Sequence, residues 1–359
     1  LISTDGDGLK IYDESTGLIT QSNIRTYEYN LATSNVKDAI VDSDGNTWVG
    51  VYWKGVLVMP DMATSFEYVG RRSVLKNTIG TNCVTAITGD GHGNLWLAAD
   101  HCGVYHLAHD GSSSVHFKPG VVKTMPSTVM SMLEDSEGTL WLGSSWSGVA
   151  KMDKHTGECV NLGAWVKDGN KIPNAYTMVE DGYKNIWIGT MGSGLFRYSL
   201  LTGELTQYKM LVDNTVVYPY QILRNLYVRT LLVHGDFLYV GTADGLEVFT
   251  LSKGGDIRLR GRFMLKSSVR DMKVDADGVL WAATTLGLVR FDIANESVKT
   301  YTVEDGLPIN STCSVEIASD GKIWVSTDDG LTCFNPEKGT FDNYHIEDGL
   351  QGNEFSVKS

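Results

Sequence analysis

Short segments in which apolar and polar residues alternate make up most of this chain, and turns rich in glycine and aspartate separate them. In a unit near the end of the chain, residues 313–317 alternate as a half-buried strand does, and a glycine-containing turn follows at 319–322. Two further turns separate the segments 323–327, 331–334 and 340–345. No segment has the period of a helix. The pattern therefore predicts four short antiparallel strands in this unit.

The unit recurs along the chain at a nearly constant spacing. Each copy contains an acidic turn with glycine, an aromatic residue a few positions later, and then a glycine followed by an apolar residue. Successive aromatic residues are 48, 45, 46, 52, 42 and 43 positions apart, and they are Trp48, Trp96, Trp141, Trp187, Tyr239, Trp281 and Trp324. Four strands in each repeat of about 40–50 residues predict an all-β fold, a β-propeller with one four-stranded antiparallel blade per repeat.

The two ends of the chain complement each other. Seven complete units run from about residue 36 to about residue 345, and residues 1–4, 8–13 and 24–29 match the second, third and fourth strands of another unit. Residues 348–357 match a lone first strand. We therefore expect eight blades in one domain over residues 1–359, with the C-terminal strand joining the three N-terminal strands and hiding the open edges. A ring of seven blades with a stray half-unit is the alternative.

The recurrent tryptophan and the acidic turn are expected to build the scaffold. A tryptophan one strand outside the innermost strand would pack between neighbouring blades, where its large ring buries much apolar surface. The turn at Asp42, Asp44 and Gly45 resembles the start of a calcium-binding loop. The twelfth position, where such a loop needs a bidentate glutamate, holds Trp53. A hairpin turn is therefore predicted, and no metal or other cofactor is expected.

Composition narrows the set of partners. The formal charge of −13 and a pI near 5.0 argue against nucleic acid and anionic membrane as partners. No apolar run approaches the ~20 residues that cross a bilayer, and no signal peptide opens the sequence. Leu1 already falls inside a repeat. We therefore expect a mature or trimmed segment that reaches a membrane only through a part of the protein outside it.

The chemistry-bearing residues do not form a catalytic pattern. The five cysteines are odd in number and lack a CxxC pair, so neither a disulfide framework nor a structural zinc site is expected. Five histidines lie between residues 92 and 116, but His106 falls in a predicted strand and His92 in a turn on the opposite face. No lipase-type, zinc-protease or phosphate-loop motif occurs. We expect no catalytic residues in this segment.

The repeat resembles that of a known family. The strings IWIGT at 186–190 and GLFRY at 194–198 are similar to the two-component regulator propeller repeat, and residues 305–310 and 348–355 resemble its connectors between blades. The resemblance implies the periplasmic sensor of a hybrid two-component histidine kinase. It further implies the kind of sensor that responds to oligosaccharides in gut bacteria that degrade polysaccharides. The kinase activity would lie elsewhere in the full-length protein.

Family members usually carry two seven-bladed propellers, an immunoglobulin-like module, a membrane helix and the kinase. This chain departs from that pattern, because it holds one ring's worth of repeats. The string DGLQGNEF at 348–355 resembles the phrase that usually opens the family's last blade. The resemblance therefore also implies a segment cut from a longer, two-propeller sensor.

A ligand site is expected in the loops, because the strands are committed to the ring. Trp53 and Trp146 both lie five residues after their repeat tryptophan, between the second and third strands, and His101 takes this place in the intervening unit. Flat aromatic side chains on a rim suit stacking against sugar rings. The other ligand-binding candidates flank these residues or lie in connectors on the same face, and they are Tyr52, Lys54, Asp100, Arg71, Arg72, Trp165, Tyr218, Tyr220 and Arg224.

We thus expect a non-catalytic sensor domain whose partner is an oligosaccharide ligand. One alternative is a streptogramin-lyase-like propeller enzyme, which needs a general base beside a divalent-metal site. The other alternative is a scaffold for protein assembly. In that case the exposed aromatic residues would cover a second subunit of a homodimer or a second propeller.

Overall fold

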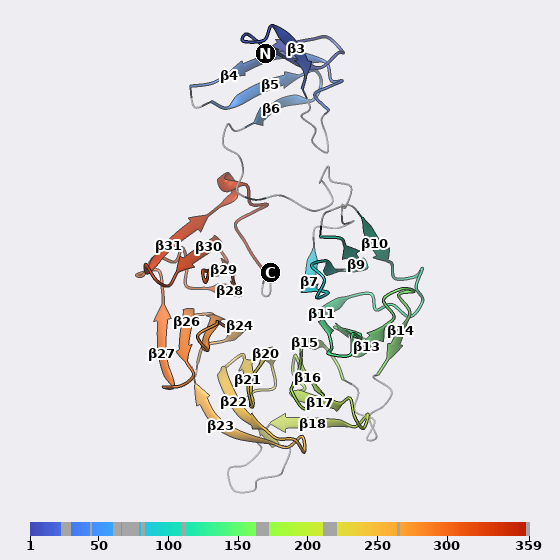
Figure 1. Cartoon of the computed structure of the whole chain (residues 1–359), viewed down its shortest axis with the longest axis vertical. Coiled ribbons are helices and arrows are strands. Elements are labelled where there is room, and N and C mark those ends of the chain that lie inside the picture. Colours follow the sequence, from blue (N-terminus) through green and yellow to red (C-terminus); the bar gives the residue numbers. More distant parts are fainter. Residues whose placement is uncertain are drawn as a thin grey trace. The chain divides into compact units, whose positions relative to one another are not determined.

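The structure is a computed structural model that describes residues 1–22, 30–43, 45–59, 66, 79, 83–109, 113–162, 172–210, 221–263 and 266–356. The chain divides into two compact units, Leu1–Gly80 and Thr81–Ser359. Figure 1 shows the strands of both units. Both units are built from β-sheets. Within the ranges given above, no helix is long and apolar enough to cross a membrane.

The N-terminal unit contains two antiparallel sheets, each of three described strands. They are β1 (Ile2–Ser3), β2 (Leu9–Asp13) and β3 (Leu18–Gln21), and β4 (Val36–Val41), β5 (Thr47–Val51) and β6 (Gly55–Met59). Leu9, Leu31, Val36, Val49 and Val51 are buried together as the core of this unit. The first sheet has the predicted second and third strands of a blade.

Strand β3 lies earlier in the chain than the predicted fourth strand at 24–29, which falls outside the described residues. The chain reverses directly after β2, because Asp13 Oδ1 accepts hydrogen bonds from the backbone N–H and the hydroxyl of Ser15. Gly17 then adopts a φ of 69°, which suits glycine, and its N–H donates to Asp13 O. This tight turn starts β3 at Leu18.

The C-terminal unit contains six blades, each with four antiparallel strands in chain order (Figure 1). The first three blades are β7 (Val84–Gly89), β8 (Leu95–Ala99), β9 (Gly103–Leu107) and β10 (Ser114–Phe117); β11 (Val129–Glu134), β12 (Leu140–Ser144), β13 (Val149–Met152) and β14 (Cys159–Asn161); and β15 (Ala175–Glu180), β16 (Asn185–Thr190), β17 (Leu195–Ser199) and β18 (Leu205–Met210). A short strand, β19 (Gln221–Leu223), pairs in parallel with β18.

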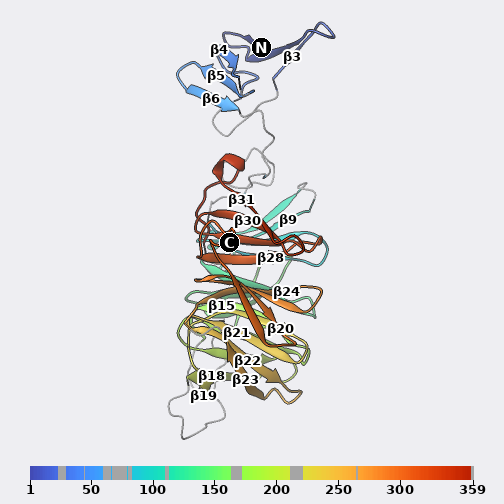
Figure 2. The same cartoon turned by 90° about the vertical axis from the view of Figure 1, so that its left-hand side faces the viewer.

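The other three blades are β20 (Val228–His234), β21 (Phe237–Thr242), β22 (Gly245–Leu251) and β23 (Ile257–Phe263); β24 (Val269–Val274), β25 (Val279–Thr284), β26 (Gly287–Asp292) and β27 (Ser297–Tyr301); and β28 (Thr312–Ile317), β29 (Ile323–Thr327), β30 (Gly330–Asn335) and β31 (Thr340–Tyr344). The first strand of each blade lies nearest the centre of the unit (Figure 1), and Figure 2 shows the same blades from the side. With the two N-terminal sheets, eight sheets match the eight predicted blades, and the all-β propeller architecture is confirmed.

Five of the seven repeat aromatic residues pack against the following blade, as predicted. Trp141 of β12 is fully buried against Ala175, Ile188 and Phe196 of the next blade. The rings at 96, 187, 239 and 281 are buried in the same way. Trp48, in the N-terminal unit, is 41% exposed. The packing of these aromatic side chains between blades is therefore the main apolar contact of the repeat.

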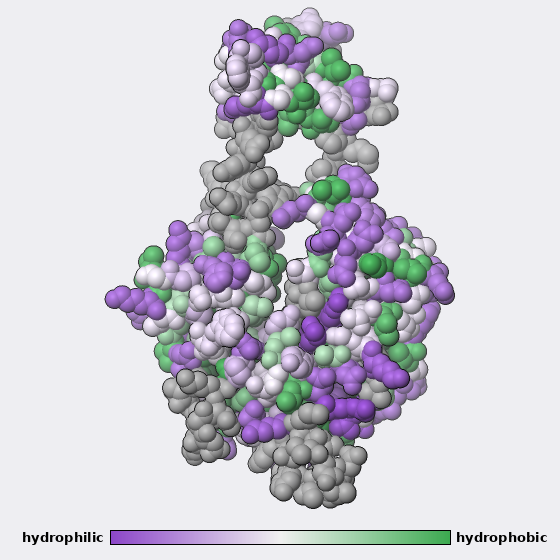
Figure 3. All heavy atoms as spheres, turned by 180° about the vertical axis from the view of Figure 1, so that it is seen from behind, coloured by the Kyte–Doolittle hydropathy of each residue, from purple (hydrophilic) through white to green (hydrophobic). Residues whose placement is uncertain are grey.

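On the side shown in Figure 3, hydrophilic and hydrophobic residues are interspersed over the surface.

A small residue two positions after the repeat aromatic residue allows neighbouring blades to lie close together. A Cβ atom on Gly189 would lie 2.5 Å from Cγ1 of Val228, at the start of the next blade. The glycine that opens each third strand has a different role. Gly287 has a φ of 136°, and a Cβ there would overlap the carbonyl oxygen of Tyr301 on the fourth strand. Only glycine suits this conformation and this spacing.

The acidic turn forms the predicted hairpin. The carboxylate of Asp135 accepts hydrogen bonds from the backbone N–H groups of Glu137 and Thr139, at 3.0 and 2.8 Å. It also accepts from Nε1 of Trp141 at 2.7 Å. The same indole contact is made to Asp42, Asp181 and Asp275. The carboxylate therefore holds both the turn and the tryptophan side chain in place. In the described part of the chain, no group of three His, Cys, Asp or Glu side chains could hold a metal ion.

The segment after β31 begins as a connector between blades does. It contains one turn of 3-10 helix at Ile346–Asp348, and no strand is found from 349 to 356. Asn353 Oδ1 accepts from the N–H of Ile346 at 2.8 Å, just as Asn310 Oδ1 accepts from Val303 at 2.9 Å. Closure of a ring by this segment, and a single domain over 1–359, stay predictions.

Candidate functional site

In the C-terminal unit, the loop between the second and third strands of a blade meets the connector that leads into its first strand. The N–H of Asp100 donates to Cys83 O at 2.9 Å, and the N–H of Thr285 donates to Ser268 O at 3.2 Å. We call the side of the blades that carries these loops and connectors the loop face. It carries the predicted site residues of this unit that the structure describes.

Trp146 projects from the loop face on an ordered loop. Ser144 Oγ accepts from the N–H of Ser147 at 2.8 Å and donates to Gly148 O at 3.2 Å. We call this hydrogen bonding by the hydroxyl group across the loop the hydroxyl clamp. The same clamp is made in other blades by Thr190, Thr242, Thr284 and Thr327. The clamp leaves Trp146 88% exposed. Trp146 therefore contributes little to the core and is available for contacts outside the fold.

The loop of His101 differs because Ala99 replaces the clamping hydroxyl residue. His101 adopts a left-handed φ of 54°, which is uncommon for a residue other than glycine. Its ring is 77% exposed, and Nε2 lies 3.7 Å from Asp100 Oδ1. Thr128 links this loop to that of Trp146: its hydroxyl donates to Asp100 Oδ1 at 3.2 Å, and its carbonyl accepts from the N–H of Ser145 at 3.4 Å. The residues next to His101 and Trp146 thus share a partner.

Trp53 belongs to the N-terminal unit, where it is 87% exposed. It has a left-handed φ of 60°, and Val51 replaces the clamping hydroxyl in its loop. Its ring meets that of Tyr52 edge to face, with 5.7 Å between centroids, and Lys37 Nζ lies 4.6 Å from the centroid of Tyr52. Lys54 is exposed beside them. A rim shared by Trp53, His101 and Trp146 stays a prediction.

Of the predicted connector residues, the structure describes Arg224. Its Nε lies 3.8 Å from Asp244 Oδ2, in the loop between the second and third strands of the same blade. Both side chains are largely exposed, so this ion pair contributes little to stability. The remaining predicted residues lie outside the described part of the chain, and they are Arg71, Arg72, Trp165, Tyr218 and Tyr220.

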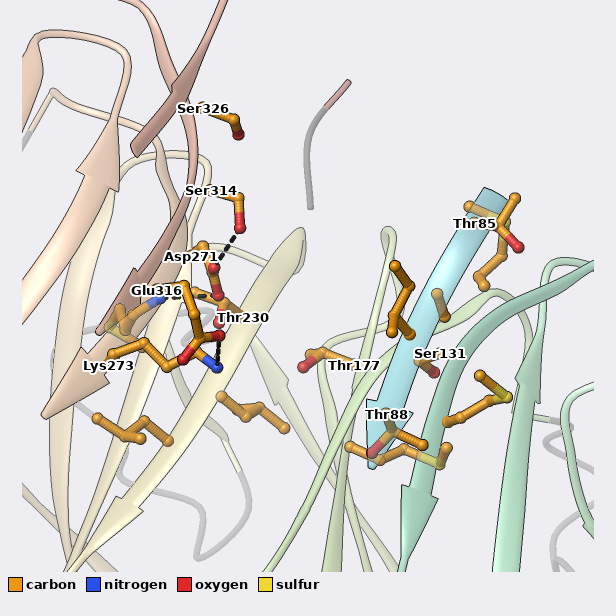
Figure 4. A pocket seen from close by; sticks show the side chains of 18 of the residues that line it. Thr85, Thr88, Ser131, Thr177, Thr230, Asp271, Lys273, Ser314, Glu316 and Ser326 are labelled. Atoms are coloured by element: carbon orange, nitrogen blue, oxygen red, sulfur yellow. Dashed lines mark hydrogen bonds and ion pairs between the residues drawn. The ribbon is translucent and has the colours of Figure 1, made fainter. Parts of the chain in front are cut away.

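A central cavity of about 670 Å³ lies among the first strands of the six blades (Figure 4). Asp271, Lys273, Ser314 and Glu316 gather on one side of it. Ser314 donates to Asp271 Oδ2 at 2.7 Å, and Lys273 Nζ lies 2.6 Å from Glu316 Oε2. Three methionines, at 130, 132 and 178, are among the residues that line it elsewhere. The cavity therefore combines polar and apolar surfaces.

The second residue of each first strand lies near the loop-face end of its own strand, because the strand begins there. In chain order these residues are Thr85, Met130, Tyr176, Arg229, Arg270 and Cys313. Burial raises the pKa of Tyr176, while the charges of Arg229 and Arg270 act in the opposite direction. Tyr176, Arg229 and Arg270 come from the first strands of three consecutive blades, β15, β20 and β24.

Sequence reasoning missed these residues because it assigned ligand contacts to loops alone. A usable signal was present: VRT at 228–230 and VRD at 269–271 align at the start of successive first strands. Arginine at the same place in two neighbouring first strands is unusual, because these strands line the interior of the ring. The blade register would have shown it.

Residues 125–146 match the family model described as two component regulator propeller. No curated protein matches the chain in sequence. The fold is similar to the extracellular domain of the B. thetaiotaomicron protein BT3049, which is named as a hybrid two-component system. In that comparison the TM-score is 0.66 at 19% identity, over 98% of this chain and 51% of that one.

A second similar structure is the extracellular domain of BT4673 from the same organism, named as a one-component system. Its TM-score is 0.61 at 17% identity, over 95% of this chain and 46% of that one. Virginiamycin B lyase from Staphylococcus aureus has a TM-score of 0.55 at 13% identity, over 73% of this chain and 84% of the lyase. The chain spans about half the length of the two extracellular domains. Residues 125–146 thus match the two-component regulator propeller repeat, and the chain has a β-propeller fold like that of these two extracellular domains.

Proposed function

We propose that this chain is the ligand-binding part of the periplasmic sensor of a hybrid two-component histidine kinase, and that its ligand is an oligosaccharide. The matching repeat and the similarity in fold to extracellular domains support the sensor role. The kinase would lie in another part of the full-length protein. One observation carries the ligand class: Trp146, held by a hydrogen-bonded loop, is 88% exposed on the loop face.

Exposed indole suits a carbohydrate partner for a physical reason. The face of a sugar ring carries C–H groups that pack on a flat aromatic surface, while its hydroxyl groups need polar partners at the edge. His101 and Asp100 supply such polar groups on the neighbouring loop, which Thr128 ties to the loop of Trp146. The ordered loops reduce the entropy that binding would otherwise cost.

The test is calorimetry of this chain against a panel of oligosaccharides, followed by the variants Trp146→Ala and His101→Ala. Loss of a stacked aromatic residue should weaken binding about fivefold to tenfold, since stacking contributes about 1–1.4 kcal/mol. The thermal midpoint should stay unchanged, because Trp146 is exposed. Leu201→Ala is the matched control: Leu201 is exposed in the turn between β17 and β18, away from the loop face.

Two outcomes would contradict the proposal. Unchanged affinity in both loop variants, for a ligand that the parent binds, would show that the loop face is not the site. Absence of binding across the panel would exclude an oligosaccharide as the ligand. A monomer–dimer equilibrium that disappears in Trp146→Ala would instead identify the indole as a contact between subunits.

A further inference from the structure

The blade of β20–β23 departs from the repeat at its aromatic position. Tyr239 stands where the other five blades of this unit carry tryptophan. Its phenol ring is smaller than an indole, and it is buried together with Met272 and Phe291 of the next blade. Six residues before Tyr239 stands Val233, so the ring lacks the turn carboxylate that accepts the indole N–H in other blades. Packing at this seam between blades therefore differs from packing at the others.

A cavity of about 240 Å³ lies at this seam. Its walls come from two neighbouring blades, whose outermost strands are β23 and β27 (Figure 1). Three exposed residues, Arg260, Ala294 and Glu296, line its mouth, so the cavity opens to solvent. Four aromatic side chains line its interior, and they are Phe237, Tyr239, Phe263 and Phe291.

The fourth strand of this blade is irregular beside the cavity. Arg260 is an extra residue on β23, because Leu259 and Gly261 on either side of it pair with successive residues of β22. The described fourth strands of the other five blades of this unit pair with their third strands without such a bulge. A bulge redirects a side chain. The guanidinium of Arg260 lies 4.8 Å from the ring centroid of Phe237, at the mouth of the cavity.

Glutamate occupies a turn position that other blades give to glycine. The turns after β13, β17 and β30 contain Gly157, Gly203 and Gly339, with φ angles of 76°, 70° and 67°. The equivalent residue in the turn after β26 is Glu296, with a φ of 52°. A residue with a Cβ atom is strained in this left-handed conformation, and such strain gathers at functional sites. The carboxylate at this place therefore needs a reason other than turn formation.

Arg260 and Glu296 form an ion pair at the mouth of the cavity. Nε and Nη2 of Arg260 donate to the same oxygen, Oε1 of Glu296, at 3.2 and 3.0 Å. Among the described residues, the other oxygen, Oε2, and the remaining nitrogen, Nη1, have no hydrogen-bond partner. Both side chains are largely exposed, so the pair contributes little to stability. The mouth thus offers a negatively charged acceptor beside a positively charged donor.

We infer that this cavity binds a free aromatic α-amino acid. Its ring would lie among the four aromatic side chains, its ammonium group on Glu296 and its carboxylate on Arg260. A cavity of about 150 Å³ holds one benzene ring, so about 240 Å³ suits a side chain of one or two rings. Aromatic rings attract one another in stacked and edge-to-face arrangements, and hydrogen bonds between charged groups are the strong ones.

The cavity is separate from the oligosaccharide site proposed above. Phe237 begins the second strand of its blade, and Glu296 lies in the turn between the third and fourth strands of the next. Both places are at the end of the strands opposite the loop face. The inference therefore adds a second ligand to the proposed function.

The probes are L-phenylalanine, L-tyrosine and L-tryptophan. For the one that binds most tightly, the matched probes are the arylpropionate, which lacks the ammonium group, and the arylethylamine, which lacks the carboxylate. Calorimetry with this chain should show at least tenfold tighter binding of the amino acid than of either matched probe, because each loses one charged contact. The bare aromatic ring compound should bind more weakly still.

Tyr239→Trp gives this blade the aromatic residue of the other blades and fills part of the cavity. It should weaken binding of the amino acid at least tenfold. Without ligand, it should keep or raise the thermal midpoint, because unfilled space in a core is destabilising. Tyr239→Phe is the matched control: it keeps the cavity and removes only the hydroxyl, so binding should stay within about threefold of the parent.

Glu296→Gly restores the glycine of the turn. It should raise the thermal midpoint, because it relieves the left-handed strain, and it should weaken binding of the amino acid to the level of the arylpropionate. A glutamate that served only the turn would lower the midpoint when removed. Glu337→Gly is the matched control, since Glu337 is exposed in the equivalent turn of the next blade and outside the left-handed region.

Arg260→Gln should weaken the amino acid to the level of the arylethylamine. Arg258→Gln is its matched control, because Arg258 is exposed on the same strand and does not line the cavity.

The inference is wrong if none of the three amino acids binds, or if Tyr239→Trp binds the amino acid as tightly as the parent does. It is also wrong if the bare ring compound binds as tightly as the amino acid, a result that would indicate an apolar side chain of a partner protein as the occupant. Parent affinity in both Glu296→Gly and Arg260→Gln would contradict it as well. Each of these results would leave the proposed oligosaccharide site standing, because that site lies on the loop face.

Discussion

The imidazole of His106 stacks on the indole of Trp96, with 4.2 Å between ring centroids and 25° between planes. Its Nε2 lies 3.0 Å from Asp90 Oδ2, the oxygen that accepts the indole N–H in other blades. As a result, Nε1 of Trp96 is buried without a partner among the described residues. The blade formed by β7–β10 thus keeps the strand arrangement of the repeat but changes its hydrogen bonding.

The first prediction concerns the usual arrangement. Asp135→Ala should lower the free energy of unfolding by about 2–3 kcal/mol, because it leaves the buried N–H of Trp141 unpaired and removes the support of the turn. Urea denaturation measures this loss. Asp153→Ala is the control, since Asp153 supports an exposed turn through His155 and Thr156 without touching an indole. Equal losses in the two variants would show that the indole bond contributes nothing.

The second prediction is a pH dependence at Asp90. Burial alone would raise its pKa, but hydrogen bonds from Asn94, the N–H of His92 and His106 outweigh burial and hold the pKa well below its ordinary value of 3.8. Folding therefore favours the ionised carboxylate. Its stabilising contribution is fully present above pH 3.8 and is lost as the pH falls through the lower pKa of the folded state.

The difference in unfolding free energy between the parent and Asp90→Asn should therefore shrink as the pH falls from about 6 to about 2. Chemical denaturation at several pH values measures it. A difference that stays constant over this range would mean that the carboxylate charge is not what the turn requires.

The third prediction separates a steric clash from backbone strain. Gly287→Ala should destabilise the fold by more than about 2 kcal/mol, because the new Cβ would overlap Tyr301 O at a φ of 136°. Gly278, in the same blade, has a φ of 77° and nothing within 4 Å of a Cβ. Gly278→Ala should therefore cost only about 1 kcal/mol of left-handed strain. Thermal midpoints that fall equally would rule out the clash.

The fourth prediction concerns thiol reactivity. Burial raises the pKa of Cys159 to about 11, and burial together with Asp328 raises the pKa of Cys313 to about 12. Both stay protonated near neutral pH, and thiols react through the thiolate. Cys83 is exposed. In the native protein, iodoacetamide should modify Cys83 first, and it should modify Cys159 and Cys313 only after unfolding. Peptide mass spectrometry would detect early labelling of Cys313, which would contradict its burial.

The scaffold could be predicted because its parts are short-range. Asp135 and Trp141 are six residues apart, and the turn between them needs no distant partner. The spacing of the tryptophans then counts the blades. Strand β3 escaped prediction because the alternation of residues 24–29 outweighed the tight turn after Asp13. Two hydroxyl clamps are missing at Val51 and Ala99, and this was visible in the sequence once the blade register was known.

The sequence by itself determined the repeat, the strands within it and the aromatic residues that stand outside it, such as Trp146. These follow from periodicity and from contacts within one blade. Only the tertiary structure decided that Arg229 Nε and Ser268 Oγ, 39 positions apart, have no hydrogen-bond partner among the described residues, while Arg270 donates to Ser311 Oγ of the next blade. Whether a polar group is satisfied depends on how neighbouring blades pack, and that packing is not encoded in the order of residues within either blade.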